Sequence, residues 1–270
     1  MRLKPDRVIT TFRSLLFNIG FFSWTALLSA LALPITLLLS DGGAIHRLAR
    51  IWVRGNFALL RVLCRLDYRV TGQEHIPAGP CIIAAKHQSA WDTMIFEILF
   101  DRPSYVLKRE LTEIPLFGKA IQLAGNVVVD RSGGSKTLRA MVADARQAVE
   151  AGRSIAIFPE GTRTKPGQHL RYHPGVAALY RELAIPVLPV ALNSGLFWGR
   201  KHFLKHPGTI QLAFLEPIEP GLDRSAFMAE LEQRIEGASM RLLEASHGPA
   251  AAKGLVDKSV DKSVDKPVDA

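Results

Sequence analysis

A long stretch without charged residues follows the first basic residues of the chain. The 27 residues between Arg13 and Asp41 contain no Asp, Glu, Lys or Arg and are mostly apolar. About 20 such residues suffice to cross the hydrocarbon core of a bilayer. A cleaved signal peptide also begins with basic residues, but its apolar region is usually shorter than this one. The stretch therefore predicts a membrane-associated helix, with a signal peptide as the alternative.

The residues from Gly42 to Leu66 predict a second helix that has a basic face. At about 100° per residue, five arginines fall within roughly a 60° arc, and apolar residues occupy much of the remaining circumference. These arginines are Arg47, Arg50, Arg54, Arg61 and Arg65. Such a helix can lie at a membrane interface with its arginines toward phosphate headgroups. The alternative is an amphipathic helix packed on the folded domain, with a solvated basic face.

The positive charge of the chain is concentrated in this N-terminal part. The formal net charge is +9, and residues 1–66 hold nine basic residues against two acidic ones. A nucleic-acid-binding protein is expected to carry its positive charge on the folded body instead. A charge excess beside the most apolar stretch favours an anionic membrane surface as the partner.

The basic residues on both sides of the apolar stretch bear on its topology. Four precede it and five follow it within the second helix, so the positive-inside rule gives a single crossing no clear orientation. A helical hairpin that dips into one leaflet, with Pro34 disturbing the first helix, places both flanks on the same side. A single transmembrane span remains the alternative.

Residues 67–248 predict one α/β domain, because short apolar runs alternate with helical patterns. The expected strands are 81–85, 126–130, 154–158, 187–192 and 209–214, and the expected helices are 90–100, 135–151, 174–183 and 224–246. Continuous apolar strands with helices between them indicate a mostly buried mixed sheet covered by helices. The first 66 residues would precede it as a membrane-associated two-helix hairpin. The repeats VDKS, VDKS and VDKP predict a disordered tail at 249–270.

The segment HQSAWD at 87–92 combines a histidine with an aspartate where a strand should end. Ser89 can cap the following helix, and Asp92 has the spacing of the acidic member of a capping box. The bend between strand and helix can bring His87 and Asp92 together at the carboxyl end of the strand, where open α/β sheets bind ligands. A carboxylate on one imidazole nitrogen leaves the other as a base. An ordinary capping aspartate beside an unrelated histidine is the alternative.

The segment IFPEGTRT at 157–164 predicts a strand that runs into a tight polar loop. Backbone N–H groups, the hydroxyl of Thr162 and the guanidinium of Arg163 together suit a phosphate or a polar headgroup. Lys108 and Arg131 are further candidate anion ligands. A surface turn with a salt bridge is the alternative for this loop, and a solvated surface charge is the alternative for Lys108 or Arg131 taken alone.

The two cysteines exclude a disulfide scaffold, and no Cys/His spacing predicts a metal site.

Four segments, taken in order, resemble the glycerophospholipid acyltransferase family. They are HQSAWD at 87–92, GNVVVDR at 125–131, FPEGTR at 158–163 and IPVLPVAL at 185–192. The similarity covers roughly residues 70–220. It implies an enzyme of phospholipid biosynthesis that is held at the inner membrane with its catalytic domain on the cytoplasmic face.

The resemblance also implies a reaction and roles for the residues of the motifs. An acyl chain would pass from a thioester of coenzyme A or acyl carrier protein to the sn-2 hydroxyl of lysophosphatidic acid, giving phosphatidic acid, without a cofactor or metal. His87 would be the general base and Asp92 would orient it. The acceptor would be bound by Lys108, Arg131, Glu160, Gly161, Thr162 and Arg163.

Other readings of the same motifs stay open at the level of sequence. The acceptor could be another lysolipid, such as a lyso-ornithine lipid or a lysophosphoethanolamine. Ser89 or Cys81 could act as a nucleophile, although Ser89 suits the helix cap and Cys81 begins an apolar strand. An inactive lipid-binding protein of the same fold is a further alternative, against which the intact His87/Asp92 pair and EGTR loop argue.

Overall fold

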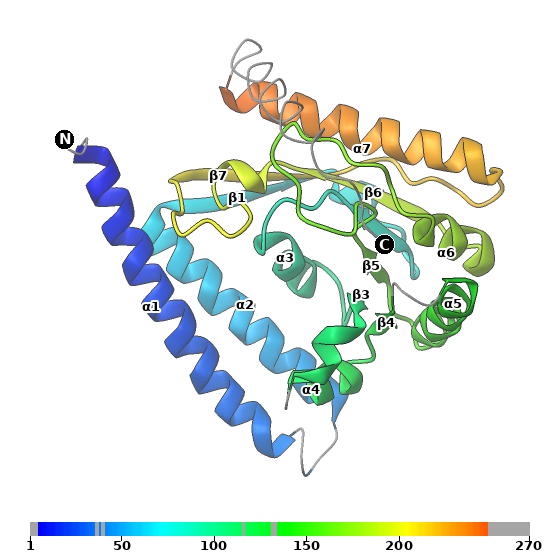
Figure 1. The fold of residues 1–270 in the computed structure, drawn as a ribbon, viewed down its shortest axis with the longest axis horizontal. Coiled ribbons are helices and arrows are strands. Elements are labelled where there is room, and N and C mark those ends of the chain that lie inside the picture. Colours follow the sequence, from blue (N-terminus) through cyan, green and yellow to red (C-terminus); the bar gives the residue numbers. More distant parts are fainter. Residues whose placement is uncertain (1–4, 36–37, 39–40, 115–116, 131–133, 248–270) are drawn as a thin grey trace.

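The structure is a computed structural model that describes residues 5–35, 38, 41–114, 117–130 and 134–247. Two predictions lie outside these residues: the disordered tail at 249–270 and the anion-binding role of Arg131. Within the described residues, a pair of long helices leads into an α/β fold built on one sheet (Figure 1).

The two N-terminal helices form the expected antiparallel hairpin. They are α1 (Pro5–Pro34) and α2 (Gly42–Cys64). The indole N–H of Trp24 donates to the carbonyl of Trp52 at 3.2 Å, and Cys64 at the end of α2 contacts the carbonyl of Arg13. Asp41 caps α2 by accepting the N–H of Ala44 at 3.1 Å. These contacts hold the two helices side by side, as Figure 1 shows.

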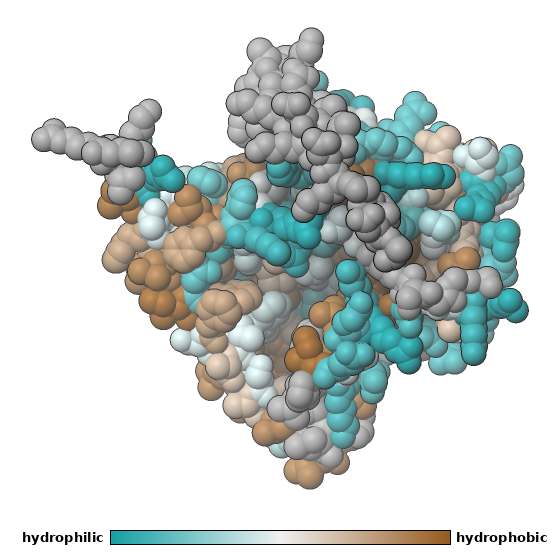
Figure 2. Space-filling view, in the orientation of Figure 1, coloured by the Kyte–Doolittle hydropathy of each residue, from teal (hydrophilic) through white to brown (hydrophobic). Residues whose placement is uncertain are grey.

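The helix α1 has two unlike faces. Its inner face packs on the rest of the molecule through buried side chains such as Ser14, Phe17 and Leu28. Its outer face carries large exposed apolar side chains: Val8, Ile9, Phe12, Leu15, Leu16, Ile19, Phe22, Leu27 and Leu31. Figure 2 shows hydrophobic residues along this edge of the molecule. Among the described helices, α1 alone is long and apolar enough to cross a membrane.

A buried lysine fastens the inner face of α1 to the α/β body. The ammonium group of Lys205 lies 5.2 Å from the ring centre of Phe17 and 5.1 Å from that of Trp198, and donates to the side-chain oxygen of Asn18 at 2.9 Å. Burial lowers the pKa of Lys205 to about 8. The backbone N–H of Lys205 also donates to Ser14 at 2.9 Å. The first half of α1 is thus docked on the body rather than separate from it.

The described strands form one mixed sheet in the order β1-β7-β6-β2-β5-β3-β4. Their bounds are β1 (Leu66–Thr71), β2 (Ile82–Ala85), β3 (Ser104–Lys108), β4 (Val127–Val129), β5 (Ile155–Ile157), β6 (Val187–Leu192) and β7 (Gly208–Phe214). Neighbouring strands run parallel except for the antiparallel pair β6–β7. The predicted mixed sheet is confirmed, and all five expected strands are present.

Helices cover both faces of the sheet, as expected for strands that are apolar throughout. The remaining α-helices are α3 (Trp91–Leu99), α4 (Phe117–Leu123), α5 (Gly134–Glu150), α6 (Gly175–Leu183) and α7 (Arg224–His247). One core lies between the sheet and α2 with α3, and the other between the sheet and α5, α6 and α7 (Figure 1). Sequence patterns missed β1, β3 and α4, whose segments are short or carry charged side chains.

The arginine face of α2 differs in part from the prediction. Arg50 turns toward the body, where its guanidinium donates to the carbonyl of Glu97 at 3.2 Å and pairs with Asp101 at 3.3 Å. Arg54 and Arg61 are exposed. The five arginines therefore do not all face one lipid surface, because one edge of their arc packs beside the end of α3.

Candidate active site

The predicted histidine and aspartate meet in the turn between β2 and α3. The Nδ1 atom of His87 lies 3.0 Å from Oδ2 of Asp92. His87 follows the carboxyl end of β2, whereas Asp92 is in the first turn of α3. The bend between the two elements brings the side chains together, as the sequence predicted.

Asp92 is fully buried and accepts hydrogen bonds from several donors besides the imidazole. Its Oδ2 atom accepts the backbone N–H groups of Gln88 at 2.6 Å and Ser89 at 2.7 Å. Its Oδ1 atom accepts the hydroxyl of Ser194 at 2.5 Å. Both oxygens of Asp92 therefore act as hydrogen-bond acceptors. We therefore assign the proton to Nδ1 of His87, which leaves Nε2 with a free lone pair.

The capping box around Ser89 forms only in part. Asp92 reaches back to the N–H of Ser89, which is the expected acidic half of the motif. The hydroxyl of Ser89 instead accepts the N–H of Trp91 at 3.2 Å, and the helix begins one residue later than predicted. The hydroxyl of Ser89 thus stabilises the turn between β2 and α3.

The loop after β5 fixes the backbone of His87 from both ends. Oε2 of Glu160 accepts the N–H of His87 at 2.9 Å, and Thr164 donates its N–H and its hydroxyl to the carbonyl of His87 at 2.8 and 3.0 Å. The ring of Phe158 stacks on the imidazole with a centroid distance of 4.1 Å. The FPEGTR segment therefore supports His87 directly.

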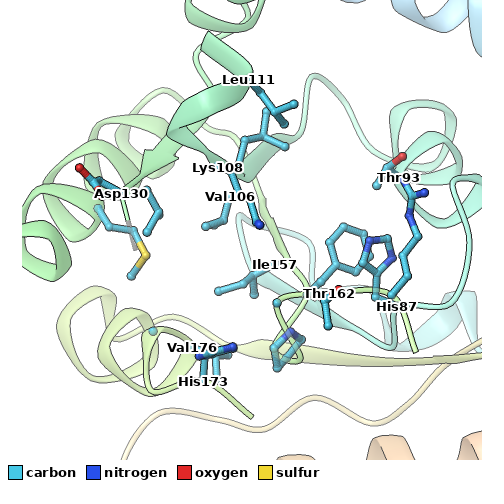
Figure 3. A pocket seen from close by; sticks show the side chains of 18 of the residues that line it. His87, Thr93, Val106, Lys108, Leu111, Asp130, Ile157, Thr162, His173 and Val176 are labelled. Atoms are coloured by element: carbon cyan, nitrogen blue, oxygen red, sulfur yellow. The ribbon is translucent and has the colours of Figure 1, made fainter. Parts of the chain in front are cut away.

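A cavity of about 600 Å³ opens beside His87. One part of its wall is apolar and includes Val129, Leu138, Met141, Ile157 and Val176. Cationic side chains also line it: Lys108, Arg163, Arg200 and Lys201. In Figure 3, His87 and Thr162 lie on one side of the cavity, and Val106, Lys108 and Leu111 lie across from them. The cavity can take a molecule with an apolar chain and an anionic group.

The structure brings most of the predicted acceptor ligands to this cavity. Lys108, Gly161, Thr162 and Arg163 line it, and Gly161 adopts a positive φ of 65° that the tight loop requires. Glu160 does not line the cavity, because its carboxylate points into a buried network with Lys86 and the N–H of His87. Burial raises the pKa of Glu160, and these two donors oppose that shift.

The alternative nucleophiles are poorly placed for catalysis. Cys81 is fully buried at the start of β2, and burial raises the pKa of its thiol to about 11. Ser89 is also fully buried, and its hydroxyl is occupied in the turn. Among the described residues, no three His, Cys, Asp or Glu side chains are grouped to hold a metal ion.

Sequence reasoning missed several residues that support the pair. Ser194, Thr164, Phe158 and Lys86 each contact His87, Asp92 or Glu160. Ser194 comes two residues after the fourth motif segment, in the turn that follows β6. No spacing pattern marks it, because its contact depends on β6 lying next to β2 in the sheet.

Comparison with known proteins gives consistent matches. Residues 67–193 match the family model described as Acyltransferase. The chain is 38% identical over 185 residues to a 1-acyl-sn-glycerol-3-phosphate acyltransferase of Pseudomonas aeruginosa, which covers 68% of this chain and 72% of that protein. It is 26% identical over 206 residues to the human 1-acyl-sn-glycerol-3-phosphate acyltransferase alpha, covering 75% and 71% of the two chains.

A solved structure resembles most of this chain. The crystal structure of the 1-acyl-sn-glycerophosphate acyltransferase from Thermotoga maritima aligns with a TM-score of 0.67 and 22% identity. The alignment covers 86% of this chain and 96% of that one. At this identity the likeness shows a common fold.

Proposed function

The chain belongs to the acyltransferase family, and we propose that it transfers an acyl chain to the sn-2 hydroxyl of 1-acyl-sn-glycerol-3-phosphate, giving phosphatidic acid. The donor would be a thioester of coenzyme A or acyl carrier protein. The observation that carries the proposal is the contact of His87 with Asp92 beside a cavity that has apolar and cationic walls. Such walls match an acceptor with one acyl chain and one phosphate.

The proposed chemistry begins at the free Nε2 atom of His87. Nε2 takes the proton of the sn-2 hydroxyl while the oxygen attacks the carbonyl carbon of the thioester. The tetrahedral intermediate collapses by breaking its carbon–sulfur bond, and the leaving thiolate takes the proton back from the imidazolium. Asp92 stabilises the imidazolium through its contact with Nδ1. The step needs neither a metal nor a nucleophile from the enzyme.

The cationic wall is the proposed site of the acceptor's phosphate. Lys108 and Arg163 would pair with the phosphate oxygens. Gly161 and Thr162, which precede Arg163 in the same loop, also line the cavity. Arg131 keeps its predicted role as a further phosphate ligand. Glu160 takes no part in this contact in our proposal, since its carboxylate lies outside the cavity.

The outer face of α1 supports attachment to the membrane in which the acceptor resides. We propose that α1 lies in one leaflet and that the α/β body stays at the cytoplasmic face of the inner membrane. The contacts of Ser14, Phe17 and Asn18 with the α/β body favour this hairpin over a separate span, because they hold the first half of α1 against the body. Protease accessibility of both termini from the same side of sealed vesicles checks this topology.

Turnover of a lysolipid panel tests the proposed acceptor. With one acyl-CoA, the purified protein should use lysophosphatidic acid at least about tenfold better in kcat/KM than a lyso-ornithine lipid or a lysophosphoethanolamine. Of these three lipids, only lysophosphatidic acid has a terminal phosphate monoester, whose oxygens can pair with both Lys108 and Arg163.

Arg163→Ala should raise the KM for lysophosphatidic acid by about 10- to 100-fold, the effect of losing a hydrogen bond to a charged group.

The controls for this experiment separate the acceptor from the reaction class. Arg181→Ala removes an exposed arginine of α6 that pairs with Glu182, and it should leave the KM unchanged. Preferred turnover of another lysolipid would refute the acceptor while retaining acyl transfer. No turnover of any lysolipid would refute the enzyme function.

Vesicle binding tests the proposed role of α1. The triple change Phe12→Ser, Leu16→Ser and Ile19→Ser removes three apolar side chains from the first half of the outer face and should weaken partition into vesicles by at least roughly 100-fold. Leu222→Ser removes an exposed leucine of the body and serves as the matched control. Flotation with vesicles measures both, and equal partition of the triple variant and the wild type would contradict membrane attachment through this face.

A further inference from the structure

A buried lysine stands next to His87 in the chain. In β2, Ile83 and Ala85 pack toward α2 and α3, whereas Ile82 and Ala84 pack toward α5, α6 and α7. Lys86 continues this alternation, so its side chain points to the α7 side of the sheet. Only 1% of its surface is exposed. The lysine is therefore outside the cavity, on the far side of the backbone that carries His87 into it.

The ammonium group of Lys86 is satisfied by acceptors from three segments. It donates to Oε1 of Glu160 at 2.6 Å, to the carbonyl of Gln168 at 2.9 Å, and to both carboxylate oxygens of Glu236 at 2.8 and 2.9 Å. Tyr172 adds a hydrogen bond to Oε1 of Glu236 at 2.8 Å. One cation thus lies between two carboxylates, one of which comes from α7.

The second oxygen of Glu160 links this cluster to the reaction site. Oε1 accepts from Lys86, and Oε2 accepts the N–H of His87 at 2.9 Å. Without the ammonium group, the buried carboxylate would face Glu236 with no counter-ion, and it would have to take up a proton or turn away. Either change would alter the bond to the N–H of His87. The orientation of Glu160 therefore depends on Lys86, and that of Lys86 on Glu236.

Stability alone gives a weak reason for such a cluster. Replacing buried ion pairs by apolar side chains of similar volume is often neutral or stabilising, because the charges no longer have to be desolvated. Simple fastening of α7 to the sheet could be achieved by apolar contacts, which Phe227, Leu231 and Ile235 of α7 already make. The charges place a defined acceptor on the N–H of His87, which apolar residues could not do.

We propose that Lys86, held by Glu236 of α7, is a positioning residue that keeps Glu160 on the N–H of His87 and so fixes the imidazole toward the acceptor hydroxyl. This inference rests on the proposed function. It assigns α7, which contributes no residue to the cavity lining, a part in the reaction. Removing Lys86 should lower kcat and leave acceptor binding unchanged.

Three variants test this proposal. Lys86→Met keeps the length of the side chain and removes the charge. The apolar variant Lys86→Met/Tyr172→Phe/Glu236→Met also removes the carboxylate of Glu236, which would otherwise face Glu160 without a cation between them, and the tyrosine hydroxyl that bonds to it. Glu232→Gln changes a carboxylate one turn earlier on α7, where it pairs with His169 instead of Lys86, and is the matched control.

The expected pattern separates positioning from stability. Lys86→Met should lower kcat by roughly 10- to 100-fold, the cost of a small misplacement of a catalytic group, with the KM for lysophosphatidic acid unchanged. It should also lower Tm. The apolar variant should regain part of the lost Tm without regaining kcat, and Glu232→Gln should match the wild type in both. Recovery of kcat together with Tm in the apolar variant would overturn the proposal.

A readout without turnover keeps the two proposals distinguishable. In protein labelled with 15N-histidine, the imidazole signal of His87, identified by its loss in His87→Ala, should shift in Lys86→Met and in the apolar variant but not in Glu232→Gln. If the wild type fails to turn over lysophosphatidic acid, the proposed function fails while this signal still reports on Lys86. An unshifted signal in the apolar variant would refute the positioning role.

Discussion

Replacing His87 by alanine should lower kcat for acyl transfer by roughly 10²- to 10⁴-fold, the usual contribution of a general base. The hydroxyl of a glycerol backbone is a poor nucleophile until its proton is removed. In the structure, His87 lines the cavity, its Nδ1 atom contacts the buried carboxylate of Asp92, and its Nε2 atom is left to act as the base. Without the imidazole, the attacking oxygen must lose its proton to water.

Single-turnover and steady-state assays of the purified variant measure this loss. The KM for the acceptor should stay within a few-fold of the wild-type value, because the cations Lys108 and Arg163 remain in place. His75→Ala is a suitable control. His75 follows β1, which runs antiparallel to β2 within the sheet. The carboxyl ends of β1 and β2 therefore lie at opposite ends of the strands, and His75 is at the end away from His87. Retention of more than a few per cent of the wild-type rate in His87→Ala would refute its assignment as the base.

The sequence predicted the parts of the fold that depend on local pattern. The strand at 187–192 is apolar at every position and is buried at every position in the sheet, and the helix at 135–151 was found within one residue. The strand β1 was missed because its sequence LDYRVT carries charges on an edge strand, where the outer side chains reach solvent. Burial decides such a strand, and burial is a property of the assembled sheet.

The same distinction applies to the candidate site. His87 and Asp92 are five residues apart, so one strand-to-helix bend was enough to predict their contact. Ser194 lies 102 residues after Asp92 and Glu236 lies 150 residues after Lys86, and only the strand order and the position of α7 bring them together. Glu160 shows the limit most clearly. The sequence predicted its motif, but its carboxylate turns away from the cavity to accept a hydrogen bond from Lys86, which follows a different strand.

Changing Asp92 to asparagine should lower kcat by roughly 10²- to 10⁴-fold while the protein stays folded. The amide is close in size to the carboxylate, and its oxygen can replace Oδ2 as the acceptor for the N–H groups of Gln88 and Ser89. Its NH₂ group then faces Ser194, whose hydroxyl can turn to accept a hydrogen bond. The contacts survive this change, whereas the negative charge beside the imidazole is lost.

That loss matters only when the imidazole carries a positive charge. As His87 takes the proton of the acceptor, an ionised Asp92 stabilises the imidazolium, and a neutral amide does so much less. In a Ser–His–Asp triad the same replacement lowers kcat by about 10⁴-fold. Because the acceptor phosphate binds elsewhere in the cavity, its KM should change little.

Comparison of two substitutions decides whether charge or shape is the contribution of Asp92. Asp92→Asn and Asp92→Ala should lower kcat to a similar extent, because both remove the charge. Asp92→Ala should also lower Tm, since it leaves the buried donors around Asp92 without an acceptor. If Asp92→Asn retained nearly full kcat while Asp92→Ala lost both kcat and Tm, Asp92 would be a helix-capping residue beside His87. In that case the base would act without a carboxylate partner.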